Sequence, residues 1–371
     1  MRVVMSKARR LRFAIPSLLV FATFICRAAP DIPVAPGMVF VIAVHNAPSE
    51  PSIHMEAAQG DYETIVTITD HGRAGIGQTA YIDGVDGFGK HRQALIPRQV
   101  RAADLANSHL QILGFYTDDP LTLPGTTSLG PSLAMVRELL GTGSTDYSFR
   151  NFSGDDSIKG TLTRANPARV KFPVLLNGQR VELDAIRTTF SSPGSSRPYE
   201  QLILDHPLHP VSLRIAWGPN GSKFPFVPLF ARDIVRIDFP VAQGPTLEVA
   251  LDKNCRVAVP GIYFDFNEAT LKPISMRALT EIAATLRKHP QWQTSIEGHT
   301  DNIGGERYND ELSLRRAAAV KMALHNDLQL TVANIATKGW GLRRPVETNE
   351  TLAGRARNRR VELVRVCEGV R

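Results

Sequence analysis

The spacing of apolar residues changes near residue 250, and this change most constrains how the chain can fold. Upstream of it, short runs with strand character are separated by turn residues. Downstream, strand-like runs alternate with longer runs in which apolar residues recur every three or four positions, as on one face of a helix. We therefore predict an α+β protein with a β-rich domain over residues 30–240, a linker over 240–254 and a second domain over 255–367.

The β-rich domain is predicted from strand-like runs. These are residues 39–44, 65–69, 110–116, 170–176, 180–190, 201–204, 211–217 and 233–239. One helix is predicted over residues 131–140, with a glycine just beyond its end. Asn177-Gly178 and Asn220-Gly221 suit the positive φ angles of tight hairpin turns. All of these runs except 180–190 are shorter than the roughly 9–11 residues of a membrane-spanning strand, and this favours a soluble domain over an outer-membrane barrel.

The second domain is predicted to alternate strands and helices. The predicted strands are residues 262–266, 293–297, 335–338 and 359–366, and the predicted helices are residues 271–289 and 309–326. The apolar face of the first helix consists of Ile274, Leu279, Ile282, Ala283 and Leu286. This order predicts parallel pairing of the first two strands, with the helices packed on the sheet.

The positive charge of the chain does not indicate a nucleic-acid partner. The formal net charge is +7, and a basic chain often binds a phosphate backbone. However, the basic residues Arg2, Lys7, Arg9, Arg10, Arg12 and Arg27 lie within residues 1–28, which contain no acidic residue. Without this segment the net charge is about +1, so we expect no nucleic-acid binding.

Residues 1–28 have the three parts of a secretory signal peptide: a basic start, an apolar stretch over residues 14–25, and small residues at Ala28 and Ala29. The apolar stretch has about 12 residues, whereas a membrane-spanning helix needs about 20. We expect cleavage after Ala28 and export of the mature chain. A lipoprotein acylated at Cys26 and an uncleaved anchor are the alternatives. No later run predicts a transmembrane span.

Two cysteines remain after removal of the signal peptide. Cys255 precedes the second domain and Cys367 follows its last predicted strand. In an oxidising compartment, an even pair placed in this way indicates a disulfide. The alternative is two unpaired cysteines.

A loop rich in polar and small residues follows the predicted strand 293–297. Residues 298–305 read GHTDNIGG, and Asn309 then suits the N-cap of the next helix. Arg316 lies two turns into this helix and is expected to point back over the loop. Asp301 can accept hydrogen bonds from an ammonium group, and Arg316 can hold a carboxylate with two parallel hydrogen bonds. The two side chains therefore predict a site for a zwitterion, in which each charge-assisted hydrogen bond contributes about 1.5–3 kcal/mol.

The same region carries a family resemblance. The motifs are YFDFNEATLKP, IEGHTDNIGGERYNDELSLRRAAAV, GWGLRRPVETN and GRARNRRVELV. Over about 105 residues, from Ile262 to Val366, the chain resembles the OmpA-like peptidoglycan-binding domain of outer-membrane proteins, peptidoglycan-associated lipoproteins and flagellar stator proteins. The resemblance implies a βαβαββ fold with a mixed sheet and helices packed on one side. It also implies recognition of diaminopimelate in the cell wall, in the periplasm or envelope of a diderm bacterium, with outer-membrane association left open.

The resemblance assigns roles to single residues. The ligand aspartate of the family falls on Asp301 and the ligand arginine on Arg316. Positions that line or support the pocket in relatives are occupied by Phe266, Thr300, Asn302, Asn309 and Leu312. Structural support is expected from Gly304 in the loop and from Asn358, Arg359 and Arg360, which match the closing motif.

Simpler roles stay open for several of these residues. Asp301 could be a turn aspartate that bonds its own backbone. Arg316 could be a surface arginine paired with Glu311 or Glu297. Phe266 could be a core residue rather than part of the pocket.

The sequence does not indicate an enzyme. Residues 84–90 have the glycine and lysine spacing of a phosphate-binding loop, but His91 occupies the position of the magnesium-binding hydroxyl. His299 has no second ligand at metal spacing, so we expect neither a metal nor a cofactor. The expected function is non-covalent binding of peptidoglycan, which would tether the β-rich domain and leave residues 30–240 to bind an envelope protein. The alternatives are a wall-anchored periplasmic enzyme with catalysis in the N-terminal domain and a stator-like component.

Overall fold

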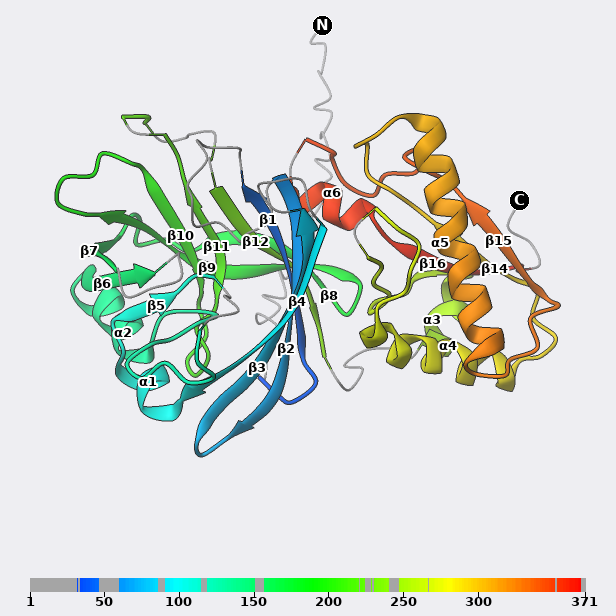
Figure 1. Cartoon of the computed structure of the whole chain (residues 1–371), viewed down its shortest axis with the longest axis horizontal. Coiled ribbons are helices and arrows are strands. Elements are labelled where there is room, and N and C mark those ends of the chain that lie inside the picture. The colour runs from blue at the N-terminus through cyan, green and yellow to red at the C-terminus, as the bar shows by residue number, and fades with distance from the viewer. Residues whose placement is uncertain are drawn as a thin grey trace, which may run out of the picture.

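The structure is a computed structural model of the chain. It describes residues 32, 34–46, 60–85, 91–114, 119–150, 157–219, 221–223, 228, 230–239, 247–265, 267–350 and 352–367. The predicted signal peptide and Phe266 lie outside these residues. Within them, no helix combines the length and apolar character needed to cross a membrane. The architecture is α+β, as predicted: a large β-sheet region lies beside a smaller sheet that is packed with helices (Figure 1).

The N-terminal domain is built on a 12-stranded sheet in the described part of the chain. Its strands are β1 (Val39–Asn46), β2 (Gly60–Gly72), β3 (Gly75–Val85), β4 (His91–Arg101), β5 (Leu110–Ile112), β6 (Ser144–Arg150), β7 (Ile158–Arg164), β8 (Val170–Leu176), β9 (Gln179–Ser191), β10 (Tyr199–Leu204), β11 (Ser212–Trp217) and β12 (Phe230–Asp238). Their order is β4-β3-β2-β1-β12-β11-β10-β9-β7-β6-β5, and β8 pairs with both β12 and β9. Every predicted run overlaps a strand. The run 110–116 is a strand only over Leu110–Ile112, and its residues 115 and 116 lie outside the described residues. Strands β3, β4, β6 and β7 were not predicted.

Two short helices accompany this sheet: α1 (Ala102–Asn107) and α2 (Leu133–Gly141). The predicted helix 131–140 is therefore confirmed. The side chain of Ser132 caps it by accepting a hydrogen bond from the backbone N–H of Met135 at 3.2 Å. The predicted turn Asn177-Gly178 is also confirmed, because both residues have positive φ and join β8 to β9 as a two-residue hairpin.

Strand β1 is apolar along most of its length because both of its faces are buried. Successive side chains of a strand point to opposite faces. Phe40, Ile42 and Val44 enter the core of the N-terminal domain, whereas Val39 and Val41 belong to a second apolar cluster. That cluster also contains Tyr263 and Ala356 of the C-terminal domain, together with Ala43, Ile65 and Val235. The N-terminal sheet therefore has one face on its own core and one face against the C-terminal domain.

The C-terminal domain has a four-stranded mixed sheet in the order β13-β16-β14-β15. Its strands are β13 (Arg256–Ala258), β14 (Thr294–Gly298), β15 (Ile335–Gly339) and β16 (Val361–Arg365). Its helices are α3 (Leu247–Asn254), the 3₁₀ turn η1 (Pro273–Ser275), α4 (Met276–Lys288), α5 (Glu306–Asn326) and α6 (Leu352–Asn358). Four residues of the predicted face, Leu279, Ile282, Ala283 and Leu286, lie on α4, are buried and share one core with α3, α5 and the sheet. The fifth, Ile274, lies in η1 and packs against the apolar cluster between the domains.

The prediction of a first strand over residues 262–266 is wrong. Phe264 forms only an isolated bridge to Leu271. The neighbouring backbone is already bonded elsewhere: the N–H of Tyr263 donates to Ser275 Oγ at 2.9 Å, and its carbonyl accepts from Ser275 Oγ at 3.0 Å. The first strand is β13 instead. The expected parallel pairing of the first two strands is wrong as well, because β14 pairs in parallel with β15 and antiparallel with β16.

The start of the C-terminal domain is anchored to its end. The second half of the expected linker forms α3, and Leu247 and Leu251 of this helix are buried in the C-terminal core. Directly after it, Cys255 forms a disulfide with Cys367, with a Cα–Cα distance of 6.1 Å. The bond closes the domain just outside β13 and β16, which are paired.

The two domains also make polar contacts. Tyr263 donates a hydrogen bond to the buried Asp238 of β12. Tyr81 of β3 donates to Asp265 at 3.2 Å. Together with the shared apolar cluster, these bonds hold the second face of the N-terminal sheet against the segment that precedes η1. Helix α6 lies at the same boundary, next to β1 (Figure 1).

Candidate functional site

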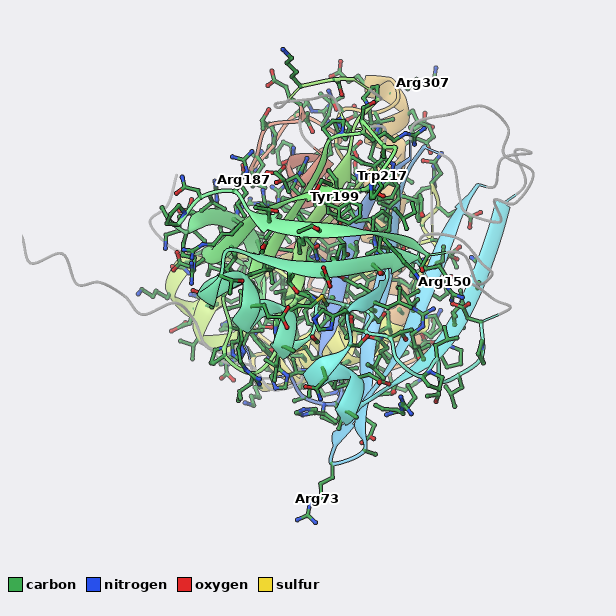
Figure 2. The ribbon with its side chains drawn as sticks, turned by 90° about the vertical axis from the view of Figure 1, so that its left-hand side faces the viewer. Arg73, Arg150, Arg187, Tyr199, Trp217 and Arg307 are labelled. Carbon is green, nitrogen blue, oxygen red and sulfur yellow. A yellow bond between two sulfur atoms is a disulfide. The ribbon has the colours of Figure 1, made fainter. Side chains whose placement is uncertain are left out.

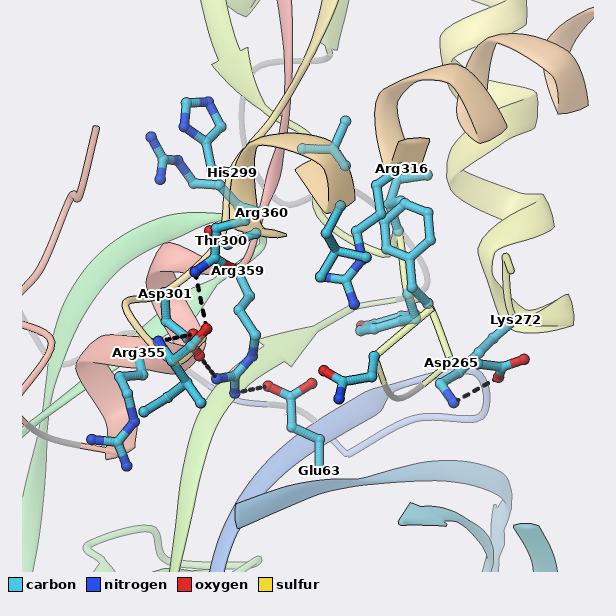
Figure 3. A pocket seen from close by; sticks show the side chains of 18 of the residues that line it. Glu63, Asp265, Lys272, His299, Thr300, Asp301, Arg316, Arg355, Arg359 and Arg360 are labelled. Atoms are coloured by element: carbon cyan, nitrogen blue, oxygen red, sulfur yellow. Dashed lines mark hydrogen bonds and ion pairs between the residues drawn. The ribbon is translucent and has the colours of Figure 1, made fainter. Parts of the chain in front are cut away.

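A pocket of about 430 Å³ lies at the boundary between the two domains. The C-terminal domain lines it with the segment before η1, the loop after β14, part of α5 and residues near the start of β16. The N-terminal domain lines it with Tyr62, Glu63 and Ile65 of β2 and with Arg236 of β12. Its volume lies within the roughly 300–1,000 Å³ of small-molecule sites. Figure 3 shows the charged side chains that enter it.

Asp301 lies at the start of the loop between β14 and α5 and is 7% exposed. Its Oδ1 accepts a hydrogen bond from the backbone N–H of Ile303 at 3.0 Å. This is the local bond of a turn aspartate. Its Oδ2 accepts a hydrogen bond from Arg359. Asp301 therefore shapes its own loop and also presents a carboxylate to the pocket.

Arg316 enters the pocket from α5. Its Nε donates to the backbone carbonyl of Glu268 at 2.9 Å, and its guanidinium carbon lies 5.0 Å from the centre of the Phe264 ring. Burial, together with the nearby charge of Arg359, lowers the pKa of Arg316 to about 10. Arg316 forms no ion pair with any residue that the structure describes. Arg316 is thus a half-buried cation that the Phe264 ring and the Glu268 carbonyl hold in place. It has no carboxylate partner among the described residues.

The suggested ion pairs of Arg316 with nearby acids are not formed. Glu311 pairs with Arg307 at 3.1 Å and lies 3.9 Å from Arg315. Glu297 pairs with Arg256 at 2.8 Å. The simpler role for Arg316, a surface arginine bound to a neighbouring acid, therefore does not describe this structure.

Arg359 joins the two acids of the pocket. Its Nη1 donates to Asp301, and its Nη2 donates to Glu63 Oε1 at 2.7 Å (Figure 3). Burial alone would lower the pKa of Arg359, but the two carboxylates outweigh it and raise this pKa above its ordinary value. Burial alone would raise the pKa of Glu63, but Arg359 outweighs it and the pKa of Glu63 is lowered. Both groups are therefore charged at neutral pH.

Two residues of this arrangement, Arg359 and Glu63, were not predicted from the sequence to lie in the pocket. Arg359 was assigned to structural support, yet it lines the pocket and bonds Asp301. Glu63 was not singled out. The one feature of the sequence that points to Glu63 is its position two residues before Ile65, at the start of a predicted strand. Residues two apart on a strand share a face, and this face of β2 meets the C-terminal domain.

The other predicted pocket residues divide into two groups. Thr300 and Leu312 are buried and line the pocket. Asn302 is exposed and is not among the lining residues. Phe266 lies outside the described residues, and the aromatic ring that contacts Arg316 is that of Phe264.

Asn309 lines the pocket but is not the N-cap of α5, because the helix begins at Glu306 with Gly305 as its N-cap. The side-chain amide of Asn309 instead donates to the backbone carbonyls of Ile303 at 2.9 Å and of Gly304 at 3.3 Å. It therefore fixes the loop that carries Asp301. Gly304 has a φ of +87°, a conformation that glycine adopts without strain.

Asn358 does not line the pocket and bonds backbone groups outside it. Its Oδ1 accepts hydrogen bonds from the backbone N–H groups of Val346 and Glu347 at 2.8 and 3.0 Å. It thereby holds the loop between β15 and α6. Arg360 pairs with Glu362 of β16 at 2.6 Å, although it also contributes to the wall of the pocket.

His299 lines the pocket and belongs to a buried cluster with Glu297 and Glu362. Possible metal-ligand atoms of Glu297, His299 and Glu362 all lie within 4.8 Å of one another. However, Glu297 pairs with Arg256, and Glu362 pairs with both Arg256 and Arg360. Because arginines already neutralise both carboxylates, we interpret the cluster as an ion-pair network that connects β13, β14 and β16.

Most of the residues that line the pocket lie in a region that is similar to known proteins. Residues 263–359 match the OmpA family. The chain is 38% identical over 122 residues to the outer membrane protein Omp38 of Acinetobacter baumannii, which is 33% of each chain. It is 42% identical over 103 residues to the outer-membrane lipoprotein YfiB of Pseudomonas aeruginosa, covering 28% of this chain and 61% of that one. The chain thus spans about a third of the length of the first of these relatives.

A solved structure matches the same region. It is the peptidoglycan-associated lipoprotein from Burkholderia pseudomallei, with 34% sequence identity and a TM-score of 0.27, and the match covers 28% of this chain and 88% of that one. All of these matches cover about a third of the chain or less. The chain carries a C-terminal domain of the OmpA family, and this domain supplies Asp301, Arg316 and Arg359 to the pocket.

Proposed function

We propose that the protein binds cell-wall peptidoglycan non-covalently and that its ligand is the diaminopimelate of the stem peptide. The observation that carries this proposal is that Asp301 and Arg316 face the same pocket of about 430 Å³ (Figure 3). One is an acid, and the other is a guanidinium that forms no ion pair within the described chain. A ligand with both an ammonium group and a carboxylate complements this pair.

The side-chain end of diaminopimelate has this chemistry, because one carbon atom carries both an amine and a carboxylate. The guanidinium of Arg316 can hold the carboxylate through two parallel hydrogen bonds. Its contact with the Phe264 ring and its bond to Glu268 restrict its position before the ligand arrives. A restricted side chain loses less conformational entropy on binding, and this favours affinity.

Binding through this pocket would tether the β-rich domain to the wall. The relatives are named as outer-membrane proteins, lipoproteins and a peptidoglycan-associated lipoprotein. These names support a location in the cell envelope of a Gram-negative bacterium. In the proposed arrangement, the C-terminal domain provides the attachment, and the N-terminal sheet is available to an envelope protein.

Co-sedimentation with purified sacculi tests the proposal. Full-length wild-type protein is expected in the pellet, and Asp301→Ala and Arg316→Ala are expected to remain in the supernatant. Arg307→Ala is a matched control, since Arg307 lies on the same helix with a side chain that is 94% exposed. Pelleting of the Asp301 and Arg316 variants at the wild-type level would refute the proposal. Release of soluble wall fragments in the same assay would instead support an enzyme.

A further inference from the structure

The ligand pocket is not confined to the OmpA-family domain, because strand β2 of the N-terminal domain forms one of its walls. Glu63 is the acidic residue of this wall. Its Oε1 accepts a hydrogen bond from Arg359, and its Oε2 has no hydrogen-bond partner among the described residues. The side chain of Glu63 is 31% exposed, so its free oxygen remains accessible to a ligand.

The charge balance of the pocket depends on Glu63. Asp301 is bonded to Arg359, and the positive charge of that guanidinium offsets the negative charge of Asp301. With Asp301 alone, the acidic side of the pocket would have no net charge to attract an ammonium group. Glu63 adds a second carboxylate on the other terminal nitrogen of the same guanidinium. The group of three then holds two carboxylates for one guanidinium and faces Arg316 (Figure 3). Arg236, Arg355 and Arg360 also line the pocket, so what Glu63 adds is a carboxylate oxygen without an arginine hydrogen bond rather than a negative charge of the whole lining.

The position of Glu63 is set by packing of the two domains. Ile65, two residues further along β2, is 2% exposed and lies in the apolar cluster that joins the domains. Strand β2 is paired on both sides, with β1 and with β3. A side chain on a strand that is paired on both sides, beside a buried neighbour on the same face, has little freedom to leave the pocket.

We infer that Glu63 is a specificity-determining residue: with Asp301 it forms a two-carboxylate receptor for a free ammonium group, so that the pocket selects stem peptides whose diaminopimelate amine has not been acylated by a cross-link. This inference rests on the proposed function. In a stem peptide that is the acceptor of a cross-link, the side-chain amine of diaminopimelate is acylated to an amide, which has no charge. A site with one neutralised acid discriminates weakly between amine and amide, whereas a second carboxylate with an unbonded oxygen can accept a charge-assisted hydrogen bond from the ammonium form.

Two synthetic ligands test this inference on the full chain by calorimetric titration. One is a stem tripeptide that ends in diaminopimelate with a free side-chain amine, and the other is the same peptide acetylated on that amine. Wild type is expected to bind the free amine about tenfold more tightly, the value of one charge-assisted hydrogen bond. Glu63→Gln is expected to lose most of this preference, and Glu63→Asp, which keeps the charge, is expected to retain part of it.

Asp70→Asn is the matched control, because Asp70 is an exposed acid on the same strand and does not line the pocket. It is expected to keep the wild-type preference. Unchanged selectivity in Glu63→Gln would refute the inference. Tighter binding of the free-amine peptide by Glu63→Gln than by wild type would also refute it, because Glu63 would then hinder binding of the ligand. These results leave the proposed function intact. Absence of binding of either peptide by wild type would instead refute the proposed function.

Discussion

Glu63 and Arg359 form an ion pair across the domain boundary, with 2.7 Å between Oε1 and Nη2. They are 296 positions apart in the sequence. The pair brings a strand of the N-terminal sheet to the pocket of an OmpA-family domain. The first two-thirds of the chain therefore contributes directly to the candidate ligand site.

Replacement of Arg316 by lysine tests whether the site binds a carboxylate through the two parallel hydrogen bonds of a planar guanidinium. Lysine keeps the charge but cannot form two parallel hydrogen bonds or the same stacking contact with Phe264. We expect Arg316→Lys to weaken binding to sacculi about tenfold, as measured by the depletion of protein from the supernatant. Arg307→Lys should leave binding unchanged. Wild-type binding by Arg316→Lys would show that a point charge is sufficient.

Two adjacent glycines offer a matched test of the loop that carries Asp301. Gly304 has a φ of +87°, and a Cβ there would lie 3.0 Å from Cδ1 of Tyr308. Gly305 has a φ of −73° and open space around it. We expect Gly304→Ala to destabilise the loop by about 1 kcal/mol and to weaken sacculus binding. Gly305→Ala is expected to cost helix stability as well, because alanine is a poorer N-cap residue than glycine, but to leave the loop conformation and the binding unchanged. Equal binding by the two variants would contradict the role of the loop conformation.

The C-terminal site was largely predictable because its parts are close in sequence. Asp301 and Arg316 lie in one loop–helix unit, so local motifs indicate both residues. The prediction of a strand over residues 262–266 was wrong because an apolar run does not show where its backbone forms hydrogen bonds. In this segment the backbone of Tyr263 bonds to Ser275 and not to a sheet.

The contribution of the N-terminal domain was not predictable in the same way. Strand β3 has glycines at its start, and β4 contains Pro97 and several charged residues, so their strand character depends on pairing with each other and with β2. Glu63 becomes a pocket residue only through the packing of the two domains, and no local pattern encodes this contact.

Reduction of the Cys255–Cys367 bond tests the closure of the C-terminal domain. The bond joins residues 112 positions apart, and removing a native disulfide typically costs about 2–5 kcal/mol. We expect the reductant to lower the free energy of unfolding of the C-terminal domain by this amount, and its urea midpoint to fall accordingly. A Cys255→Ser, Cys367→Ser double variant should start at the lower midpoint and not respond to reductant. An unchanged wild-type midpoint would contradict the prediction.

The buried Glu362 makes stability depend on pH. Burial alone would raise its pKa, but His299, Arg360 and Arg256 outweigh burial, and the pKa of Glu362 in the folded protein is lowered. Its contribution to stability is therefore present above the ordinary glutamate pKa of about 4.3 and is lost as the pH falls towards the folded pKa. We expect Glu362→Gln to lose about 3–5 kcal/mol at pH 7. Urea unfolding at pH 7 and pH 3 should show the gap to wild type narrowing at pH 3, and a constant gap would contradict this assignment.

In the proposed complex, Arg316 binds the side-chain carboxylate of diaminopimelate. Titration of the full chain with two stem tripeptides tests it directly, because lysine has the same side-chain amine but lacks that carboxylate. We expect wild type to bind the tripeptide that ends in diaminopimelate and to have a much lower affinity for the tripeptide that ends in lysine. Arg316→Ala is expected to bind both peptides with that same low affinity. Equal affinity of wild type for the two peptides would contradict the account.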